Sequence, residues 1–161
     1  GTYALPEAQL DRFLFKIRVG YPKLEEEVTI LKTHHDRKLA VPQDAIEGVL
    51  GIDDLKKFRG QVQEILIEDK IFNYIAQVVN KTRNHPYLYL GGSPRASLAI
   101  MNASKAFAAI NGRDFVTPDD VKRSLAPVLR HRIILSPERE MEGMTPETVI
   151  DMIAQSIEIP R

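Results

Sequence analysis

The chain has 161 residues, of which 43% are hydrophobic, and it contains no cysteine. This length and composition predict one compact domain, or a domain with a short appendage, that buries a core without cross-links. The lack of cysteine excludes a disulfide framework and thiolate metal sites, and it fits a reducing compartment. Lysine and arginine together number 22, as do aspartate and glutamate, so the chain lacks the basic excess of a typical nucleic-acid binder.

Membrane and metal sites are not expected either. No apolar run approaches the ~18 residues that a membrane-spanning helix needs, and no signal-peptide pattern opens the printed sequence. The four histidines include no i, i+4 pair and no other ligand spacing. We therefore expect a soluble, cytoplasmic protein without a bound metal of its own.

The first twenty residues differ from the rest. Leu5–Leu10 predicts a helical turn with Pro6 near its start. In Phe13–Val19, apolar residues alternate with Lys16 and Arg18, and this period of two predicts a strand. Since one strand cannot bury itself, we interpret the segment as a short α/β remnant with one strand.

The remainder is predicted to be mainly α. Lys23–His35 begins with acidic residues and ends with basic ones, which suits the helix dipole. Asp69–Arg83 has aliphatic residues at helical spacing, with Asp69 as a candidate N-cap. The clearest helix runs from Ser93-Pro94 to Asn111-Gly112, with small residues along one face.

Two further helices are predicted near the C-terminus, and each has a threonine N-cap followed by proline. Thr117 and Asp120 occupy the positions of a capping box at the first of them. Thr145 repeats the start signal for the last helix, which runs towards Ile157.

Two arginines are candidates for binding an anion. Arg95 lies in the first turn of the helix that Ser93 caps, where the helix dipole disfavours a cation by roughly 0.3–1 kcal/mol. A phosphate at this helix start would be attracted by backbone N–H groups and by the guanidinium, but a salt bridge explains the position equally well. For Arg12, spacing alone favours a local charge pair with Asp11 or Glu7.

Other enzymatic motifs are absent from the sequence. Gly91-Gly92 allows unusual backbone angles ahead of Ser93, but no G-x-x-x-x-G-K-[ST] phosphate-binding string occurs. No nucleophile elbow and no Ser/His/Asp set can be nominated from spacing.

Several motifs resemble blocks of the MoxR-type AAA+ ATPases, and they occur in the family's order. The first, Pro6–Phe13, is similar to the family's Pro-Glu-Ala-x-Leu-Asp-Arg-Phe block. The others are Ile17–Pro22, Thr82-Arg83, Gly92–Ala96, Gly112–Val121 and Val128–Ile133. The resemblance implies that residues 1–21 form the C-terminal edge of the nucleotide-binding α/β core and that residues 22–161 form the AAA+ helical lid domain, a helical bundle.

The same resemblance implies roles for individual residues. Arg12 would be the arginine finger, which reaches the nucleotide of the neighbouring subunit. Arg95 would be the sensor 2 residue, which contacts the terminal phosphates of its own subunit's nucleotide; Gly92, Ser93 and Pro94 would complete the cofactor-binding segment. Both roles suit arginine, because phosphoryl transfer is catalysed mainly by positioning and by neutralising developing charge.

For the parent protein, the resemblance implies an ATP- and Mg²⁺-dependent hydrolase that works in a ring, such as a hexamer. Its lid would contact its own AAA+ core and neighbouring subunits. Hydrolysis would be coupled to chaperone-like assembly or maturation of partner proteins, often with a von Willebrand factor A domain. The family's phosphate-binding loop and Mg²⁺-binding acidic residues precede these blocks and are absent here, so we expect the 161-residue chain alone neither to bind ATP tightly nor to hydrolyse it.

Three alternatives stay open at this point. The chain could be a non-catalytic helical protein-binding module that docks through Glu25–Glu27 or Lys56–Arg59. It could bind DNA through a helix-turn-helix at Thr117, although the zero net charge disfavours this. It could also be the lid of another AAA+ branch, such as a magnesium-chelatase-like subunit, which shares the Leu-Asp-Arg-Phe block.

Overall fold

The computed structural model describes residues 5–38, 41 and 46–160. The backbone divides into two compact units. The main unit comprises residues 1–16 and 59–161, and the second unit comprises residues 17–58. The described residues are mainly helical, with one two-stranded sheet, so the predicted fold class is confirmed.

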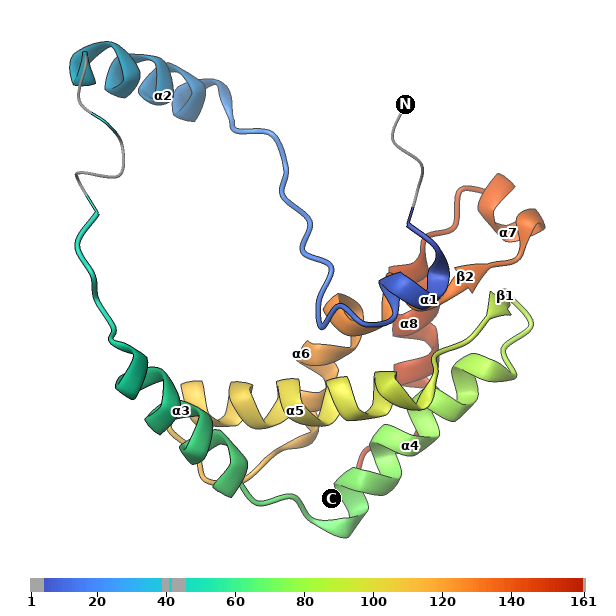
Figure 1. Cartoon of the computed structure of the whole chain (residues 1–161). Helices are drawn as coiled ribbons and strands as arrows, with labels where there is room; N and C mark the ends of the chain where they lie inside the picture. Colours follow the sequence, from blue (N-terminus) through green and yellow to red (C-terminus); the bar gives the residue numbers. More distant parts are fainter. Residues whose placement is uncertain (1–4, 39–40, 42–45, 161) are drawn as a thin grey trace. The chain divides into compact units, whose positions relative to one another are not determined.

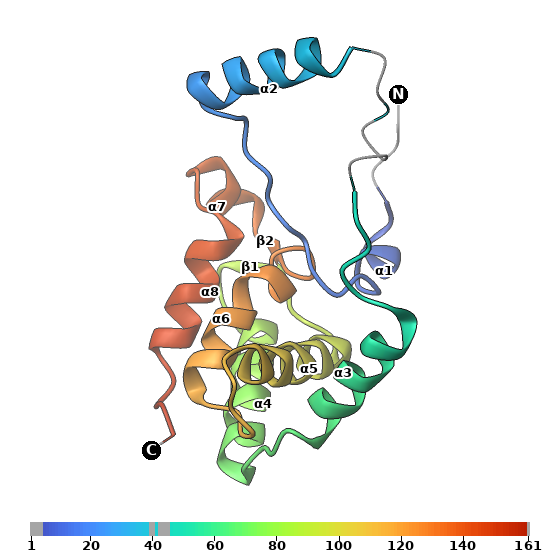
Figure 2. The same ribbon diagram turned by 90° about the vertical axis from the view of Figure 1, so that its left-hand side faces the viewer.

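The main unit is a bundle of helices with a small sheet at one end (Figures 1 and 2). Its elements, in chain order, are α1 (Glu7–Leu10), α4 (Asp69–Arg83), β1 (Leu88–Leu90), α5 (Pro94–Ile110), α6 (Pro118–Leu129), β2 (Ile134–Leu135), α7 (Pro137–Met141) and α8 (Pro146–Gln155). The long helix α5 packs against α4 and α6, and α8 packs against both of those helices. β1 and β2 pair antiparallel, with Leu88 opposite Leu135.

The hydrophobic core lies where these helices meet. On α4, Ile71, Ile75, Val78 and Val79 recur at helical spacing and are buried. The small residues of α5, Ala96, Ala99 and Ala103, are also buried, which lets neighbouring helices approach closely. Ile110, the last residue of α5, lies on the same predicted face but is 76% exposed.

Local capping explains where the helices begin. Ser93 Oγ accepts a hydrogen bond from the backbone N–H of Arg95, and the Thr117–Asp120 capping box is present, as predicted. α4 begins at Asp69 as its first helical residue, so the N-cap is Glu68 and the assignment of Asp69 as cap was one residue late.

The second unit holds α2 (Leu24–Arg37), and it contains most of α3 (Ile52–Glu64), which ends in the main unit. α2 confirms the helix predicted at Lys23–His35. None of the described residues of the second unit is buried.

The strand predicted at Phe13–Val19 is wrong. This segment has no strand assignment, because no strand among the described residues pairs with it. Its first part is held to the main unit in other ways: Lys16 N donates to Pro127 O over 3.0 Å, and Phe15 packs on the core. Within the described part of the chain, no helix is long and apolar enough to span a membrane.

Candidate functional site

The start of α5 fixes the backbone around Arg95. Ser93 is extended, with φ −73° and ψ 171°, and its Oγ lies 3.2 Å from the Arg95 N–H that it caps. Pro94 follows at the first helical position, where its fixed φ suits the helix. Arg95 is therefore held in the first turn, near the positive end of the helix dipole.

The two glycines ahead of Ser93 serve close packing. A Cβ on Gly91 would lie 2.6 Å from the Arg83 backbone, so only glycine fits against the end of α4. Gly92 N donates to Thr82 Oγ1 over 2.9 Å, and Gly92 O accepts from Arg83 Nε over 2.8 Å. Neither glycine has a positive φ, so the backbone freedom that glycine allows is not what these positions require. The N–H of Gly92 is already used within the fold.

The Asp11 carboxylate connects the N-terminal segment to the start of α5. It accepts hydrogen bonds from Ser93 Oγ, with 3.0 Å to each carboxylate oxygen. It also accepts from Arg95 Nη1 over 3.4 Å and from Arg132 Nε over 3.2 Å. One carboxylate thus joins three side chains that are more than 80 positions away in the sequence.

Arg132 fixes the segment that carries Asp11. Its side chain is only 3% exposed, and its Nη atoms donate to the backbone carbonyls of Asp11, Phe13, Leu14 and Val128 over 2.5–3.1 Å. Burial lowers the pKa of Arg132, and the charge and hydrogen bond of Asp11 oppose this effect. A guanidinium is suited to this position because its planar donors can serve several carbonyls at once.

The neighbouring imidazole contributes to the same attachment. His131 Nε2 lies 2.8 Å from Phe13 O, and burial lowers the pKa of this histidine below its ordinary value. His131 thus helps to hold the N-terminal segment against the main unit. No group of metal-ligating side chains occurs among the described residues.

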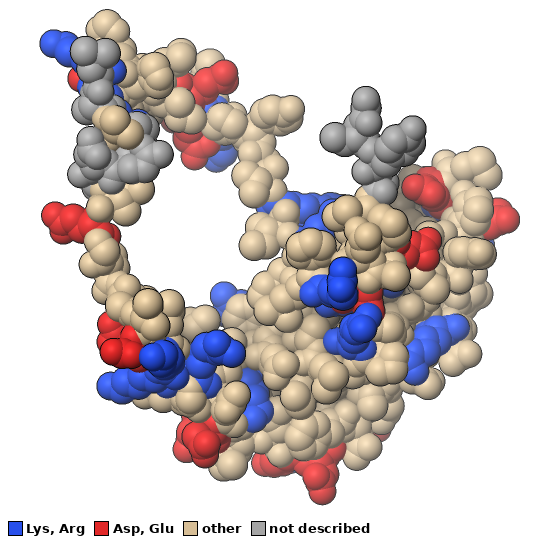
Figure 3. Space-filling view, viewed as in Figure 1, with Lys and Arg blue, Asp and Glu red and all other residues tan. Residues whose placement is uncertain are grey.

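A shallow depression of about 340 Å³ lies beside this network and contains both predicted arginines. Its lining includes Arg12, Arg95, Asp11, Asn102 and Arg132. Arg12 is exposed, and within the described part of the chain its guanidinium has no ion pair or hydrogen bond. The Arg95 side chain is 63% exposed and keeps the single long contact to Asp11. Figure 3 shows basic side chains gathered on this face of the main unit, over α5 and the end of α1.

The structure therefore brings the two sequence-predicted arginines together. The salt bridge considered for Arg95 is present, with Asp11 as the acid, while the local pair considered for Arg12 is not among the described contacts. Asp11 and Arg132 were not nominated as site residues from the sequence. The family-like motif at Pro6–Phe13 pointed to the region of Asp11, but no spacing rule links Asp11 to Arg132, which lies 121 positions later.

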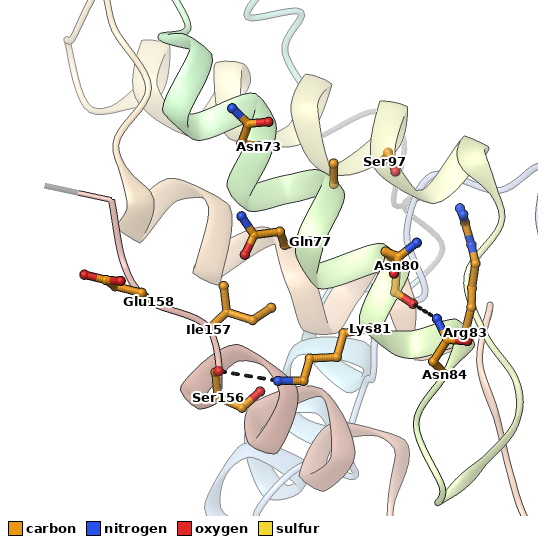
Figure 4. Close-up of a pocket in the computed structure, with 11 residues that line it drawn as sticks. Asn73, Gln77, Asn80, Lys81, Arg83, Asn84, Ser97, Ser156, Ile157 and Glu158 are labelled. Carbon is orange, nitrogen blue, oxygen red and sulfur yellow. Dashed lines mark hydrogen bonds between the residues drawn. The ribbon is translucent and has the colours of Figure 1, made fainter.

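A larger polar pocket of about 660 Å³ lies elsewhere, between α4 and the C-terminal segment (Figure 4). Amide side chains line it, including Asn73, Gln77 and Asn80. Its two cations are engaged with backbone carbonyls: Lys81 Nζ donates to Ser156 O over 3.4 Å, and Arg83 donates to Gly92. The depression at Arg12 and Arg95 is thus the better candidate for an anion.

Comparison with known proteins identifies a matching family and several similar chains. The AAA lid domain family matches residues 80–153. The Bacillus subtilis protein YeaC, itself named as uncharacterized, is 41% identical over 160 residues, which cover 99% of this chain and 49% of the relative. The Mycobacterium tuberculosis chaperone MoxR1 is 36% identical over 170 residues, which cover 100% of this chain and 44% of the relative.

A solved structure extends the comparison to the fold. The crystal structure of a proposed ATPase from Cytophaga hutchinsonii superposes with a TM-score of 0.88 at 30% identity, over 100% of this chain and 51% of that one. Residues 80–153, which hold the end of α4 and most of the helices after it, thus form a AAA lid domain. The chain belongs to the MoxR-type AAA+ family and corresponds to its C-terminal part. It spans about half the length of the relatives that it matches.

Proposed function

We propose that the chain is the lid and arginine-finger segment of a MoxR-type ATPase that couples ATP hydrolysis to chaperone-like assembly or maturation of partner proteins. One observation carries this proposal: Arg12 and Arg95 line one depression, and most of their hydrogen-bond donors are unused by the described residues. Two exposed guanidinium groups with spare donors fit the negative charge of a triphosphate.

In this proposal Arg95 is the sensor 2 residue. It lies in the first turn of α5. The preceding residues of the proposed cofactor-binding segment, Gly92, Ser93 and Pro94, orient the backbone there, but the N–H of Gly92 is already bonded within the fold. Its flexible, exposed side chain would contact the terminal phosphates of the nucleotide bound by its own subunit. The contribution is electrostatic, since a fixed positive charge stabilises the charge that develops in the transition state.

Arg12 is proposed as the arginine finger that acts on the neighbouring subunit's nucleotide. Its exposed guanidinium, free of ion pairs within the described part of the chain, is consistent with reaching outward. The shared depression favours a second candidate, in which Arg12 and Arg95 hold the same phosphate within one subunit. The two candidates differ in whether Arg12 acts across a subunit boundary.

The parent protein would bind ATP and Mg²⁺ with residues outside this chain and would form a ring, such as a hexamer. Residues 1–21 would complete its nucleotide-binding core, and residues 22–161 would form the lid, in the cytoplasm. Its clients would include proteins with a von Willebrand factor A domain. The chaperone name of the M. tuberculosis relative supports this type of activity.

The first test is substitution of each arginine in the full-length protein. We expect Arg95→Ala and Arg12→Ala each to lower kcat by about 10²-fold or more, as for other lost transition-state donors. Arg123→Ala is the matched control, because this exposed arginine lies over the Phe107 ring, outside the depression. Near-normal turnover in both site variants would refute the proposed mechanism.

Mixed rings then separate the two candidates for Arg12. Subunits with Arg12→Ala are mixed with subunits whose phosphate-binding loop is disabled. If Arg12 acts in trans, an intact finger beside an intact loop restores part of the activity. If it acts within its own subunit, mixed rings are as inactive as either variant alone.

The 161-residue chain by itself is expected to show no tight ATP binding and no hydrolysis, because it lacks a phosphate-binding loop. Calorimetric titration with ATP and a phosphate-release assay measure this directly. Turnover at the rate of the full-length protein would contradict the assignment.

A further inference from the structure

Asp11 has an unusual position between the two arginines. Its backbone is joined directly to Arg12, and its carboxylate is 3.4 Å from Arg95 Nη1. The same carboxylate is therefore linked covalently to the proposed finger and electrostatically to the proposed sensor. Among the described residues, no other acidic side chain lines the depression.

The partners of Asp11 differ in how firmly they are held. Arg132 is buried and tied to four backbone carbonyls, and Ser93 is fixed as the N-cap of α5. Arg95 is 63% exposed and makes the longest of the three contacts. An exposed ion pair of this kind is weak, so Arg95 is the partner that an incoming anion can remove.

A triphosphate is a stronger competitor for a guanidinium than a single carboxylate, because it offers more charge and more acceptor oxygens. When Arg95 turns to a phosphate, Asp11 loses one of its three side-chain partners. The Asp11 carboxylate then keeps only its contacts with Ser93 and Arg132, so the interactions that position the turn at residues 11–14 change. Arg12 lies within that turn.

We propose that Asp11 is a positioning residue that holds Arg95 until nucleotide binds. When Arg95 is released, the turn at residues 11–14 adjusts and changes the position of Arg12. This inference rests on the proposed function and adds to it a coupling between the two nucleotide sites that one subunit serves. Binding in a subunit's own site would thereby adjust the finger that it presents to the next subunit. A link of this kind is a coupling free energy, and it is measurable as cooperativity.

The test is Asp11→Asn in the full-length protein. The amide keeps an acceptor oxygen for Ser93 or Arg132 but removes the charge that competes for Arg95. We expect the Kd for a fluorescent ATP analogue to fall by about three- to tenfold and the Hill coefficient of hydrolysis to fall towards 1. A merely structural lesion would weaken nucleotide binding, so the direction of the change identifies the role.

Two comparisons sharpen the result. Asp119→Asn is the matched control, because that carboxylate is 91% exposed and pairs only with Lys122 within the described residues, at 3.8 Å. In an Arg95→Gln background, Asp11→Asn should no longer tighten nucleotide binding, because the guanidinium for which Asp11 and the nucleotide compete is then absent. Thermal unfolding checks that each variant folds. If the Asp11→Asn variant does not fold, Asp11→Ser takes its place, because it also removes the carboxylate charge.

The outcomes are distinct. Unchanged or weaker binding in folded Asp11 variants, or a wild-type Hill coefficient of 1, overturns the proposed coupling. If Arg95→Gln alone leaves nucleotide affinity and turnover unchanged, the proposed function fails instead, whatever Asp11 does. The expected result is tighter binding with lost cooperativity in Asp11→Asn, and no change in Asp119→Asn.

Discussion

Asp120 illustrates how one buried side chain stabilises the start of a helix. It is 3% exposed and accepts two hydrogen bonds from the Arg113 guanidinium, at 2.6 and 2.7 Å. It also accepts from Thr117 N and Thr117 Oγ1, each at 2.9 Å. Burial alone raises the pKa of Asp120, but these hydrogen bonds outweigh it and the net pKa lies below the ordinary 3.8.

The lowered pKa of Asp120 predicts a pH dependence of stability. Because the folded state holds this proton less tightly than the unfolded state, the contribution is complete above pH 3.8 and is lost as the pH falls through the folded pKa. Asp120→Asn should cost on the order of 3 kcal/mol at neutral pH, since it leaves Arg113 without its buried partner. Thermal unfolding from pH 7 to pH 3 measures both effects.

The neighbouring carboxylate provides the control for this prediction. Asp119→Asn should change stability little at any pH, because Asp119 is 91% exposed. In acid, the difference in Tm between wild type and Asp120→Asn should shrink. An equal difference at pH 7 and pH 3 would show that the charge of Asp120 does not stabilise α6.

At the scale of elements, the loop between β1 and α5 depends on glycine. Gly91→Ala would push a Cβ to within 2.6 Å of Arg83 backbone atoms that cannot move without disturbing α4. We expect a loss of about 2 kcal/mol or more, as for other strained core positions, together with weaker nucleotide binding in the full-length protein because Ser93 and Arg95 are displaced.

Gly60→Ala is the matched control for the loop. Gly60 lies inside α3, and a Cβ added there would meet no described atom within 4 Å, so alanine should stabilise the helix by up to about 1 kcal/mol. Chemical denaturation of both variants gives the two free energies of unfolding. A Gly91→Ala protein as stable as wild type would show that the loop can move away from α4.

Three helix starts that were predicted correctly have the same local signal. Ser93-Pro94, Thr117-Pro118 and Thr145-Pro146 each place a capping side chain next to a proline, and each begins a helix. α3 lacks such a signal and was missed, and the five-residue helix α7 was missed although Ser136-Pro137 stands at its start. The pairing of β1 with β2 joins residues more than 40 positions apart, and no local pattern specifies it.

The candidate site was predictable only in part for the same reason. The motifs that contain Arg12 and Arg95 could be matched to a family, and the structure places both arginines at one depression. The bonds between Asp11 and Arg132 span 121 positions and exist only once the chain has folded. Sequence periodicity also misassigned Phe13–Val19, where residues 13 and 14 form a bend and the rest, without a partner strand, has no regular secondary structure.

At the scale of the whole molecule, the buried hydrophobic cluster belongs to one unit. Its members run from Ile65 to Ile157, and every one lies in the main unit. In the second unit, no described residue is buried. The free energy that stabilises the main unit therefore comes from its own helices.

This distribution predicts that the main unit folds without the second. We expect a protein in which residues 17–58 are replaced by a flexible Gly/Ser linker of about 20 residues, with an r.m.s. span of roughly 25 Å, to keep a cooperative thermal transition within a few degrees of the original. Calorimetry measures this transition. Loss of a cooperative transition would show that the second unit is needed for the main core.

The contact between His131 and Phe13 fixes the chemical form of an imidazole. A carbonyl oxygen only accepts hydrogen bonds, so Nε2 must carry the proton in the 2.8 Å contact with Phe13 O. In the neutral ring, Nδ1 is then a bare lone pair, buried and without a partner among the described residues. The ring is thus locked as a single tautomer, and its two nitrogen resonances report whether the N-terminal segment is seated.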